Sequence, residues 1–347
     1  MERQLTPSLN VRQADDGIDA LAVAAKEVNG NARRALALLR DLDFVPHPGR
    51  GRTRELFEKL AQLATEDLTS ARVAEAHLDA RAILAQAGSD APADQTWGVF
   101  AAEGSGTTLT ASPLGNRWKL NGTKPWCSLA GILSHALVTA RVVQPDGGQC
   151  RRLFAVDLRQ AGITVHDEAW VARGLREVKS GPVDFDDIEA DAVGDEGWYL
   201  TRPGFAWGGI GVAAVWWGGT VGLARTLYNS LQARKPDQIA LAHLGAVDLA
   251  VTASAYALAA AATAIDAGEA DGAAGTLLAA RVRGEVARSV DSVIFHVGHA
   301  LGPAPLALDA RHAQRIADLQ LYVRQHHGEH DDAALGHLLV TKGRVPW

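Results

Sequence analysis

Histidine and acidic residues gather near the C-terminus, in residues 325–331 with the sequence QHHGEHD. Imidazole nitrogens and carboxylates can bind metal ions or transfer protons. The spacing in this segment is neither that of a zinc-binding helix nor that of a zinc finger. We therefore predict no metal site, and a solvated helix end is the plain structural interpretation of these residues.

A glycine-rich segment, residues 104–108 (GSGTT), is a second candidate because glycine-rich loops can cradle phosphate groups. It contains no glycine–lysine pair opening a helix, so it is not a P-loop. No GxGxxG motif lies between a strand and a helix, which argues against a Rossmann domain. Cys127 and Cys150 are too few for a disulfide framework or a metal site, and we interpret them as small apolar residues.

The composition is that of a globular protein, with 347 residues of which 47% are hydrophobic and 21% charged. The net charge of -6 comes from interspersed acids and bases, which argues against a nucleic-acid partner. We find no apolar run that we expect to cross a bilayer, so we predict no membrane partner. The N-terminus lacks the pattern of a secretory signal, and we predict a cytoplasmic protein.

Hydrophobic periodicity divides the chain into three blocks and predicts an α+β fold. Helical spacing of leucines predicts an N-terminal helical domain over residues 1–92. Alternating residues predict a central antiparallel β-domain over residues 93–200, with Asn121 and Gly122 as its clearest hairpin turn. Alanine-rich helical spacing predicts a C-terminal four-helix bundle over residues 201–347. The expected bundle helices lie near residues 212–232, 239–267, 272–297 and 309–324.

Residues 118–128 have the sequence WKLNGTKPWCS. This segment resembles the strand motif W-x-L-N-G-x-K-x-W-(I/F)-(T/S) of the acyl-CoA dehydrogenase family. That family has a helical N-terminal domain, a central β-domain and a C-terminal four-helix bundle, which is the order predicted here over nearly the whole chain. Residues 98–106 (GVFAAEGSG) are similar to the family's A-x-T-E-P-x-A-G-S stretch near the flavin, without its threonine and proline. The resemblance implies an acyl-CoA dehydrogenase-like fold and an FAD cofactor.

The resemblance also implies which residues of the two segments contact the flavin. Trp126 would pack beside the isoalloxazine ring, because the ring favours a flat apolar wall. The hydroxyl of Ser128 would reach the N5 side of the ring. Cys127 occupies the apolar position of the first segment, and Phe100 lies in the second.

Two further cofactor contacts are implied across a subunit interface. Residues 295–302 (FHVGHALG) resemble the family segment Q-x-x-G-G-x-G, which places Gly298 and His299 near the cofactor of a neighbouring subunit. Arg234 is the nearest match to the family arginine that binds the FAD pyrophosphate, although the Phe-Gly of that motif is missing. The resemblance therefore implies a homodimer or a homotetramer.

The catalytic base departs from the family pattern. Many family dehydrogenases carry a glutamate in R-D-x-x-x-x-x-I-Y-E-G-T, which removes the substrate α-proton. Counting from Asp318 places His326 at that position, with Glu329 three residues further on. The first hypothesis is therefore α,β-dehydrogenation of an acyl thioester such as an acyl-CoA, with His326 or Glu329 as the base.

Histidines near the flavin also occur in flavin-dependent monooxygenases of this fold, which hydroxylate aromatic or sulfur compounds. His77 lies on the helix that faces the flavin cavity in such relatives. With His326 it supports a second hypothesis, a two-component monooxygenase that uses reduced flavin and oxygen. A histidine on an apolar helical face is also a common core residue. A third hypothesis is a degenerate family member without catalysis, because several family motifs are weakened.

Overall fold

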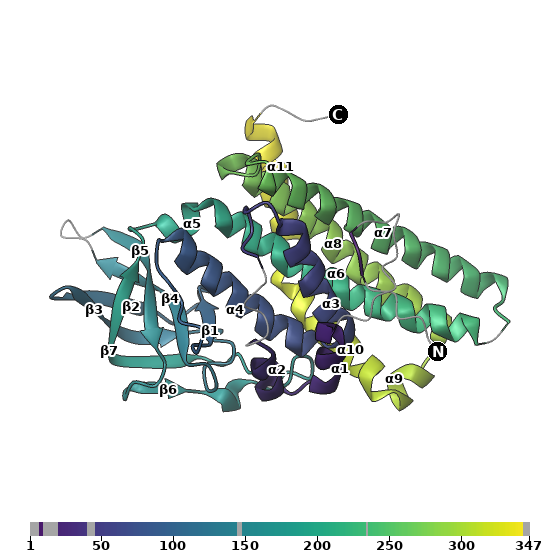
Figure 1. The fold of residues 1–347 in the computed structure, drawn as a ribbon, viewed down its shortest axis with the longest axis horizontal. Coiled ribbons are helices and arrows are strands. Elements are labelled where there is room, and N and C mark those ends of the chain that lie inside the picture. Colours follow the sequence, from purple (N-terminus) through teal and green to yellow (C-terminus); the bar gives the residue numbers. More distant parts are fainter. Residues whose placement is uncertain (1–6, 10–19, 40–45, 144–147, 234, 343–347) are drawn as a thin grey trace.

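The computed structural model describes residues 7–9, 20–39, 46–143, 148–233 and 235–342. The strands gather at one end of the molecule and the long helices at the other (Figure 1). The N-terminal helices are α1 (Ala20–Val28), α2 (Ala32–Leu38), α3 (Thr53–Glu66) and α4 (Leu68–Gln86). The change from helix to strand falls after α4, where the sequence changes from helical to alternating periodicity.

Helix α4 is the central helix of the molecule. It begins at Asp67, whose side chain caps it by accepting from the backbone N–H of Ser70 at 2.7 Å. It packs against α2 and α3, against the sheet strand β1 (Trp97–Phe100), and against α6 (Pro203–Gln232). Of its 19 residues 14 are buried, so α4 has almost no solvent face and connects the β-domain to the long helices.

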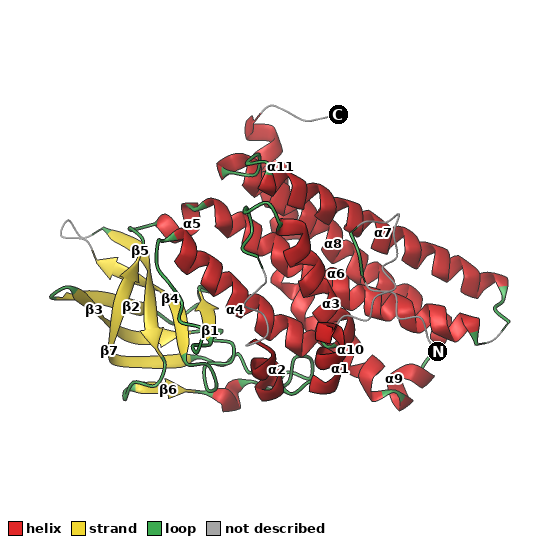
Figure 2. Cartoon of the chain, in the orientation of Figure 1, coloured by secondary structure: helices red, strands yellow, loops and turns green. Residues whose placement is uncertain are grey.

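The strands form a closed sheet with two additional strands (Figure 2). The remaining strands are β2 (Leu109–Leu114), β3 (Arg117–Lys124), β4 (His135–Val143), β5 (Gln149–Asp157), β6 (Ile163–Val165) and β7 (Val183–Val193). Pairing runs from β4 through β2, β3, β7 and β5 back to β4, while β1 adds to β4 and β6 to β7. The expectation of a wholly antiparallel domain is wrong, because β1 and β2 both run parallel to β4.

The predicted hairpin turn at Asn121 and Gly122 is also wrong. Both residues lie inside β3, and the turn between β2 and β3 is made by Gly115 and Asn116. Gly122 has a φ of 118° beside a register shift against β7, which is typical of a β-bulge. A Cβ atom there would lie 2.2 Å from the carbonyl oxygen of Thr108, so only glycine allows this close approach.

The C-terminal helices pack on one another and on the N-terminal helices. After α6 come α7 (Gln238–Asp266), α8 (Gly272–Leu301), α10 (Ala310–Tyr322) and α11 (Glu329–Lys342), with the short helices α5 (Trp198–Thr201) and α9 (Ala304–Leu308). Helix α3 contacts both α6 and α7, so these helices share one core. A Cβ atom at Gly218 would lie 2.3 Å from the carbonyl oxygen of Ala61, so glycine allows α6 to approach α3 closely.

Helix α7 is more apolar than the sequence led us to expect. By length and composition alone it could cross a membrane, contrary to the expectation that no run could. In this structure it packs against α6 and α8, and the opposite face of the helix is exposed to solvent. Six of the exposed residues on that face are small or apolar and follow one another at three- or four-residue spacing: Ala242, Gly245, Leu249, Ala253, Tyr256 and Ala260. A helix that faces water usually presents polar residues, so this face is suited to being covered.

Candidate functional site

The two segments that resemble the flavin-binding motifs lie against each other at the edge of the β-domain. The ammonium of Lys124, only 2% exposed, lies 2.8 Å from a carboxylate oxygen of Glu103. A Cβ atom at Gly104 would lie 3.0 Å from a ring carbon of Pro125. The segments are therefore one structural unit, held by the ion pair of buried Lys124 with Glu103 and by the close contact of Gly104 with the ring of Pro125.

Trp126 projects from this unit into solvent. Its φ is 59° and its side chain is 58% exposed, whereas Cys127 next to it is buried with its sulfur 3.3 Å from the carbonyl oxygen of Lys124. A large exposed aromatic ring costs hydrophobic burial energy, and a positive φ is unfavourable for a bulky residue. This combination suits an indole that serves as a wall for a planar ligand.

Ser128 links the segment that carries Trp126 to buried charged residues on the helices. Its Oγ lies 2.8 Å from the Oγ of Ser180 and accepts from the guanidinium of Arg72 at 3.3 Å. Arg72 also forms an ion pair of 2.6 Å with Glu75, and the side chains of this pair are only 14% and 10% exposed. The hydroxyl of Tyr322 donates to the same Glu75 oxygen at 3.1 Å. The β-domain, α4 and the end of α10 thus meet in one hydrogen-bonded network.

A second carboxylate lies one turn further along α4. Asp79 is 3.7 Å from the guanidinium of Arg202, and burial raises the pKa of Asp79 to about 6 even though Arg202 acts in the opposite direction. Gly208 on α6 makes room for this side chain, because a Cβ atom there would lie 2.9 Å from the Asp79 carboxylate. Asp79 and Glu75 both line a small hollow of about 30 Å³, whose other walls are mainly apolar. These walls include Leu56, Leu60, Leu78 and Trp207.

The sequence pointed to His77 and Phe100, and both are core residues in the structure. The Nδ1 atom of His77 accepts from the backbone N–H of Trp97 at 3.1 Å, and this bond joins α4 to β1. The ring is 4% exposed and Phe100 is 1% exposed. The core interpretation of His77 therefore agrees with this contact, and a flavin role for either residue stays a prediction.

His326 is buried, whereas Glu329 is exposed to solvent. His326 is 8% exposed, and its Nδ1 accepts from the backbone N–H of Gly328 at 3.3 Å. Burial lowers the pKa of His326, which favours the neutral ring at neutral pH. Glu329 begins α11 and is exposed to solvent. The structure therefore places a neutral histidine, and no buried glutamate, at the position where the family motif would put its base.

The residues implied to act across a subunit interface lie far from Trp126 within one chain. Gly298 and His299 are near the end of α8 that leads to α9, at the end of the molecule opposite the sheet (Figure 1). The ring of His299 contacts that of Phe295 in a tilted arrangement, with centroids 4.0 Å apart. The contact of Gly298 and His299 with the cofactor of a neighbouring subunit stays a prediction. Arg234 lies outside the described residues.

Sequence reasoning missed Arg72, Glu75, Asp79 and Tyr322. The first three share one face of α4 because they are spaced three and four residues apart. The sequence contained one signal, since three ionisable residues on one face of a single helix can form a polar cluster when that face is buried. Their partner Tyr322 lies 247 residues after Glu75 in the sequence, and no local sequence pattern predicts that contact.

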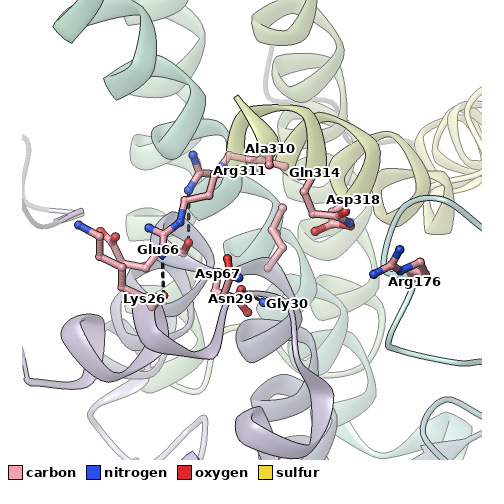
Figure 3. A pocket seen from close by; sticks show the side chains of 12 residues that line it. Lys26, Asn29, Gly30, Glu66, Asp67, Arg176, Ala310, Arg311, Gln314 and Asp318 are labelled. Atoms are coloured by element: carbon pink, nitrogen blue, oxygen red, sulfur yellow. Dashed lines mark hydrogen bonds between the residues drawn. The ribbon is translucent and has the colours of Figure 1, made fainter. Parts of the chain in front are cut away.

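The largest cavity that we describe lies elsewhere, and most of the residues that line it are charged or polar. It measures about 270 Å³ and lies among α1, α3, α10 and the loop before β7 (Figure 3). Its charged walls largely bond to backbone groups, as Arg315 does by donating to the carbonyl oxygen of Thr65 at 2.6 Å. Asp318 likewise accepts from the backbone N–H of Leu175. We interpret this cavity as the junction between the loop and the helices.

Asp318 should make the stability of this junction depend on pH. Burial raises its pKa from the ordinary value of 3.8 to about 6, so the folded protein retains a proton that the unfolded chain releases between these values. The free energy of unfolding should therefore fall as the pH rises from about 4 to about 6. Asp318→Asn keeps a carbonyl acceptor and should remove this decline, a relative gain at pH 7 on the order of 1–3 kcal/mol. Urea unfolding at pH 4 and pH 7 measures it, and equal pH dependence in both proteins would contradict the assignment.

Comparison with known proteins agrees with this architecture. Residues 86–188 match the family model of the acyl-CoA dehydrogenase middle domain. No curated protein matches the chain. Among solved structures, the FMN-bound dibenzothiophene monooxygenase of Paenibacillus sp. A11-2 has 16% identity and a TM-score of 0.80, with 94% of this chain and 96% of that chain covered.

Two other solved structures are similar over most of their length. The methanesulfinate monooxygenase of Pseudomonas fluorescens has 17% identity and a TM-score of 0.77, with 95% of this chain and 99% of that chain covered. KijD3, solved with FMN and a dTDP-linked sugar, has 19% identity and a TM-score of 0.74, with 87% of this chain and 85% of that chain covered. Residues 86–188 therefore form an acyl-CoA dehydrogenase middle domain, and the whole chain has the acyl-CoA dehydrogenase-like fold.

Proposed function

We propose that this protein is a flavin-dependent monooxygenase that acts on a small molecule. The observation that carries the proposal is the connection from α10 to α11, where His326 is buried and Glu329, the first residue of α11, is exposed. Dehydrogenation of an acyl thioester needs a base that can remove an α-proton next to the flavin. The buried carboxylate of Glu75 is poorly suited to this task, because an Arg72 guanidinium and a Tyr322 hydroxyl already donate to it.

The described residues fit a flavin ring. Trp126 offers an exposed flat face, and Ser128 offers a hydroxyl at its edge, as the ring requires. The similar structures that name a flavin contain FMN, so we propose FMN in place of the FAD implied by the sequence resemblance. When bound in its reduced form, the flavin supplies the two electrons needed to transfer one oxygen atom of O₂ to a substrate and release the other as water.

Buried residues of this chain would surround the space in which the flavin and the substrate react. The network of Arg72, Glu75 and Tyr322 holds its charges away from bulk water, which strengthens their interactions with a ligand. The mainly apolar residues around the small hollow beside Asp79 would limit the access of water to this carboxyl. The carboxyl of Asp79, with its pKa of about 6, could hold or release a proton near neutral pH.

Isotope labelling tests the proposed reaction. Purified protein would be supplied with FMN reduced by a separate flavin reductase, ¹⁸O₂ and a panel of aromatic, thioether and amine compounds. We expect one ¹⁸O atom in the product of at least one compound, and none without the protein. Anaerobic bleaching of the flavin-loaded protein by an acyl-CoA, with no oxygen incorporation, would instead establish the dehydrogenase hypothesis.

The open face of α7 supports a homo-oligomer. The charged residues of the helix are only Asp248 and, at its last position, Asp266. Leu249 and Tyr256 on that face are 73% and 60% exposed. We propose that a second copy of this chain covers this apolar face, because burial of such residues is the usual driving force for stable homodimers. The same assembly could bring His299 of one copy to the flavin site of another.

Leu249→Glu should therefore shift the protein to monomers. A carboxylate in the centre of an apolar interface would lose hydration without gaining a partner. Because Leu249 is exposed within one chain, the fold of the monomer should be unchanged. Size-exclusion chromatography with light scattering measures the assembly, and Leu308→Glu at an 86% exposed leucine of α9 is the control. A monomeric wild-type protein would contradict the proposal.

A further inference from the structure

The hydroxyl of Ser128 is held in place from two sides. The backbone N–H of Cys127 donates to the carbonyl oxygen of Gly181 at 3.0 Å, and that of Leu129 donates to the carbonyl oxygen of Lys179 at 2.6 Å. These two bonds set Ser128 opposite Ser180, where the hydroxyl oxygens are 2.8 Å apart. On its other side Ser128 meets the guanidinium of Arg72.

The partners of Ser180 determine which hydroxyl donates. Ser180 donates its single hydroxyl hydrogen to the carbonyl oxygen of Val178 at 2.9 Å. It therefore has only lone pairs to offer to Ser128, so the hydrogen between the two hydroxyls belongs to Ser128. The bonds run in one direction, from Ser128 to Ser180 and from Ser180 to Val178.

Arg72 occupies one of the hydrogen-bond acceptor sites of the Ser128 hydroxyl. A guanidinium has donors and no acceptor, so Arg72 can only donate to the Ser128 oxygen. A hydroxyl oxygen has two lone pairs. With its hydrogen directed to Ser180 and one lone pair directed to Arg72, Ser128 has one lone pair left for a ligand and no hydrogen to donate.

The two oxidation states of a flavin differ in the group that they present at N5. Oxidised flavin has a bare N5 that accepts a hydrogen bond, whereas reduced flavin has an N5–H that donates one. We infer that Ser128, Ser180 and Arg72 form a hydrogen-bond device that selects reduced over oxidised flavin, because the free lone pair of Ser128 is complementary only to N5–H. This inference rests on the proposed function and on the placement of N5 beside Ser128.

Ser180 and Arg72 are positioning residues in this arrangement, since they act on the flavin through Ser128. Glu75 and Tyr322 in turn hold Arg72, so its guanidinium keeps its orientation. A protein that prefers reduced flavin would collect it from a separate reductase and release it after oxidation. The device therefore provides a physical reason for a two-component reaction.

Anaerobic binding measurements with Ser180→Ala test the inference. Loss of the Ser180 acceptor frees the Ser128 hydrogen to turn toward N5 of oxidised FMN. We expect the wild type to bind reduced FMN at least about tenfold more tightly than oxidised FMN, and the variant to lose about tenfold of that preference. The midpoint potential of bound FMN should fall by about 30 mV, which is a tenfold change for a two-electron couple. Titrations of both oxidation states and a potentiometric measurement give these values.

Two controls separate the possible outcomes. Ser112→Ala changes an exposed serine of β2 and should leave the preference unchanged. Ser128→Ala should remove most of the preference, because the selecting oxygen is gone. If FMN binds normally and Ser180→Ala keeps the wild-type preference, the inference is overturned while the proposed function stands. If the wild type binds FMN in neither oxidation state, the proposed function itself fails.

Discussion

Replacing Glu75 with alanine is expected to lower the free energy of unfolding by about 3–5 kcal/mol. The change leaves the guanidinium of Arg72, whose side chain is 14% exposed, without its carboxylate partner. It also removes the acceptor of the hydroxyl of Tyr322, the buried last residue of α10. An unpaired buried charge and an unsatisfied buried donor are among the most destabilising single defects. Urea denaturation followed by circular dichroism measures the loss.

A matched pair on the neighbouring helix provides the control. Arg52 and Glu55 have the same spacing at the start of α3 and lie 2.7 Å apart, but their side chains are 58% and 33% exposed. Glu55→Ala should cost less than about 1 kcal/mol, because exposed ion pairs contribute little. If the two variants lose the same stability, Arg72 and Glu75 do not form the buried pair described above.

Replacing Trp126 with alanine is expected to weaken FMN binding by about 10- to 100-fold. Stacking of a planar ring system on an aromatic side chain contributes roughly 1–3 kcal/mol, and each 1.4 kcal/mol changes affinity about tenfold. The thermal stability of the flavin-free protein should change little, because the indole is 58% exposed and therefore makes a limited packing contribution. Quenching of FMN fluorescence measures binding.

Trp126→Phe distinguishes loss of the flat surface from general damage to the loop. Phenylalanine retains an aromatic face at the same backbone position, so its affinity for FMN should stay much nearer that of the wild type. Unchanged FMN affinity in Trp126→Ala would show that the ring lies elsewhere, and would remove the basis for the role of Ser128.

Local patterns were sufficient to predict much of the fold. The predicted helices near residues 239–267 and 272–297 are α7 and α8. A repeating period of three to four residues identifies such helices because burial of one face requires it. The motif around Trp126 was also visible, since its residues are contiguous.

The two errors in the β-domain have a common physical cause. Asn121 and Gly122 are typical turn residues, but the glycine is used here for a bulge with positive φ inside a long strand. Whether a glycine with positive φ makes a turn or a bulge depends on the strand that pairs with it. The parallel pairing of β1 and β2 with β4 depends likewise on how distant segments are arranged in space.

The amino-acid sequence alone was enough to predict the helical and strand blocks and the flavin-like motif. Three further features depend on tertiary contacts: His77 bonds to a strand, Glu329 faces solvent, and Arg72 joins Ser128 to Tyr322. The difference arises from the sequence separation of the contacting residues. Periodicity and motifs record the free energy of burying one face of a local segment, whereas the direction of a buried charge depends on partners supplied by segments hundreds of residues away.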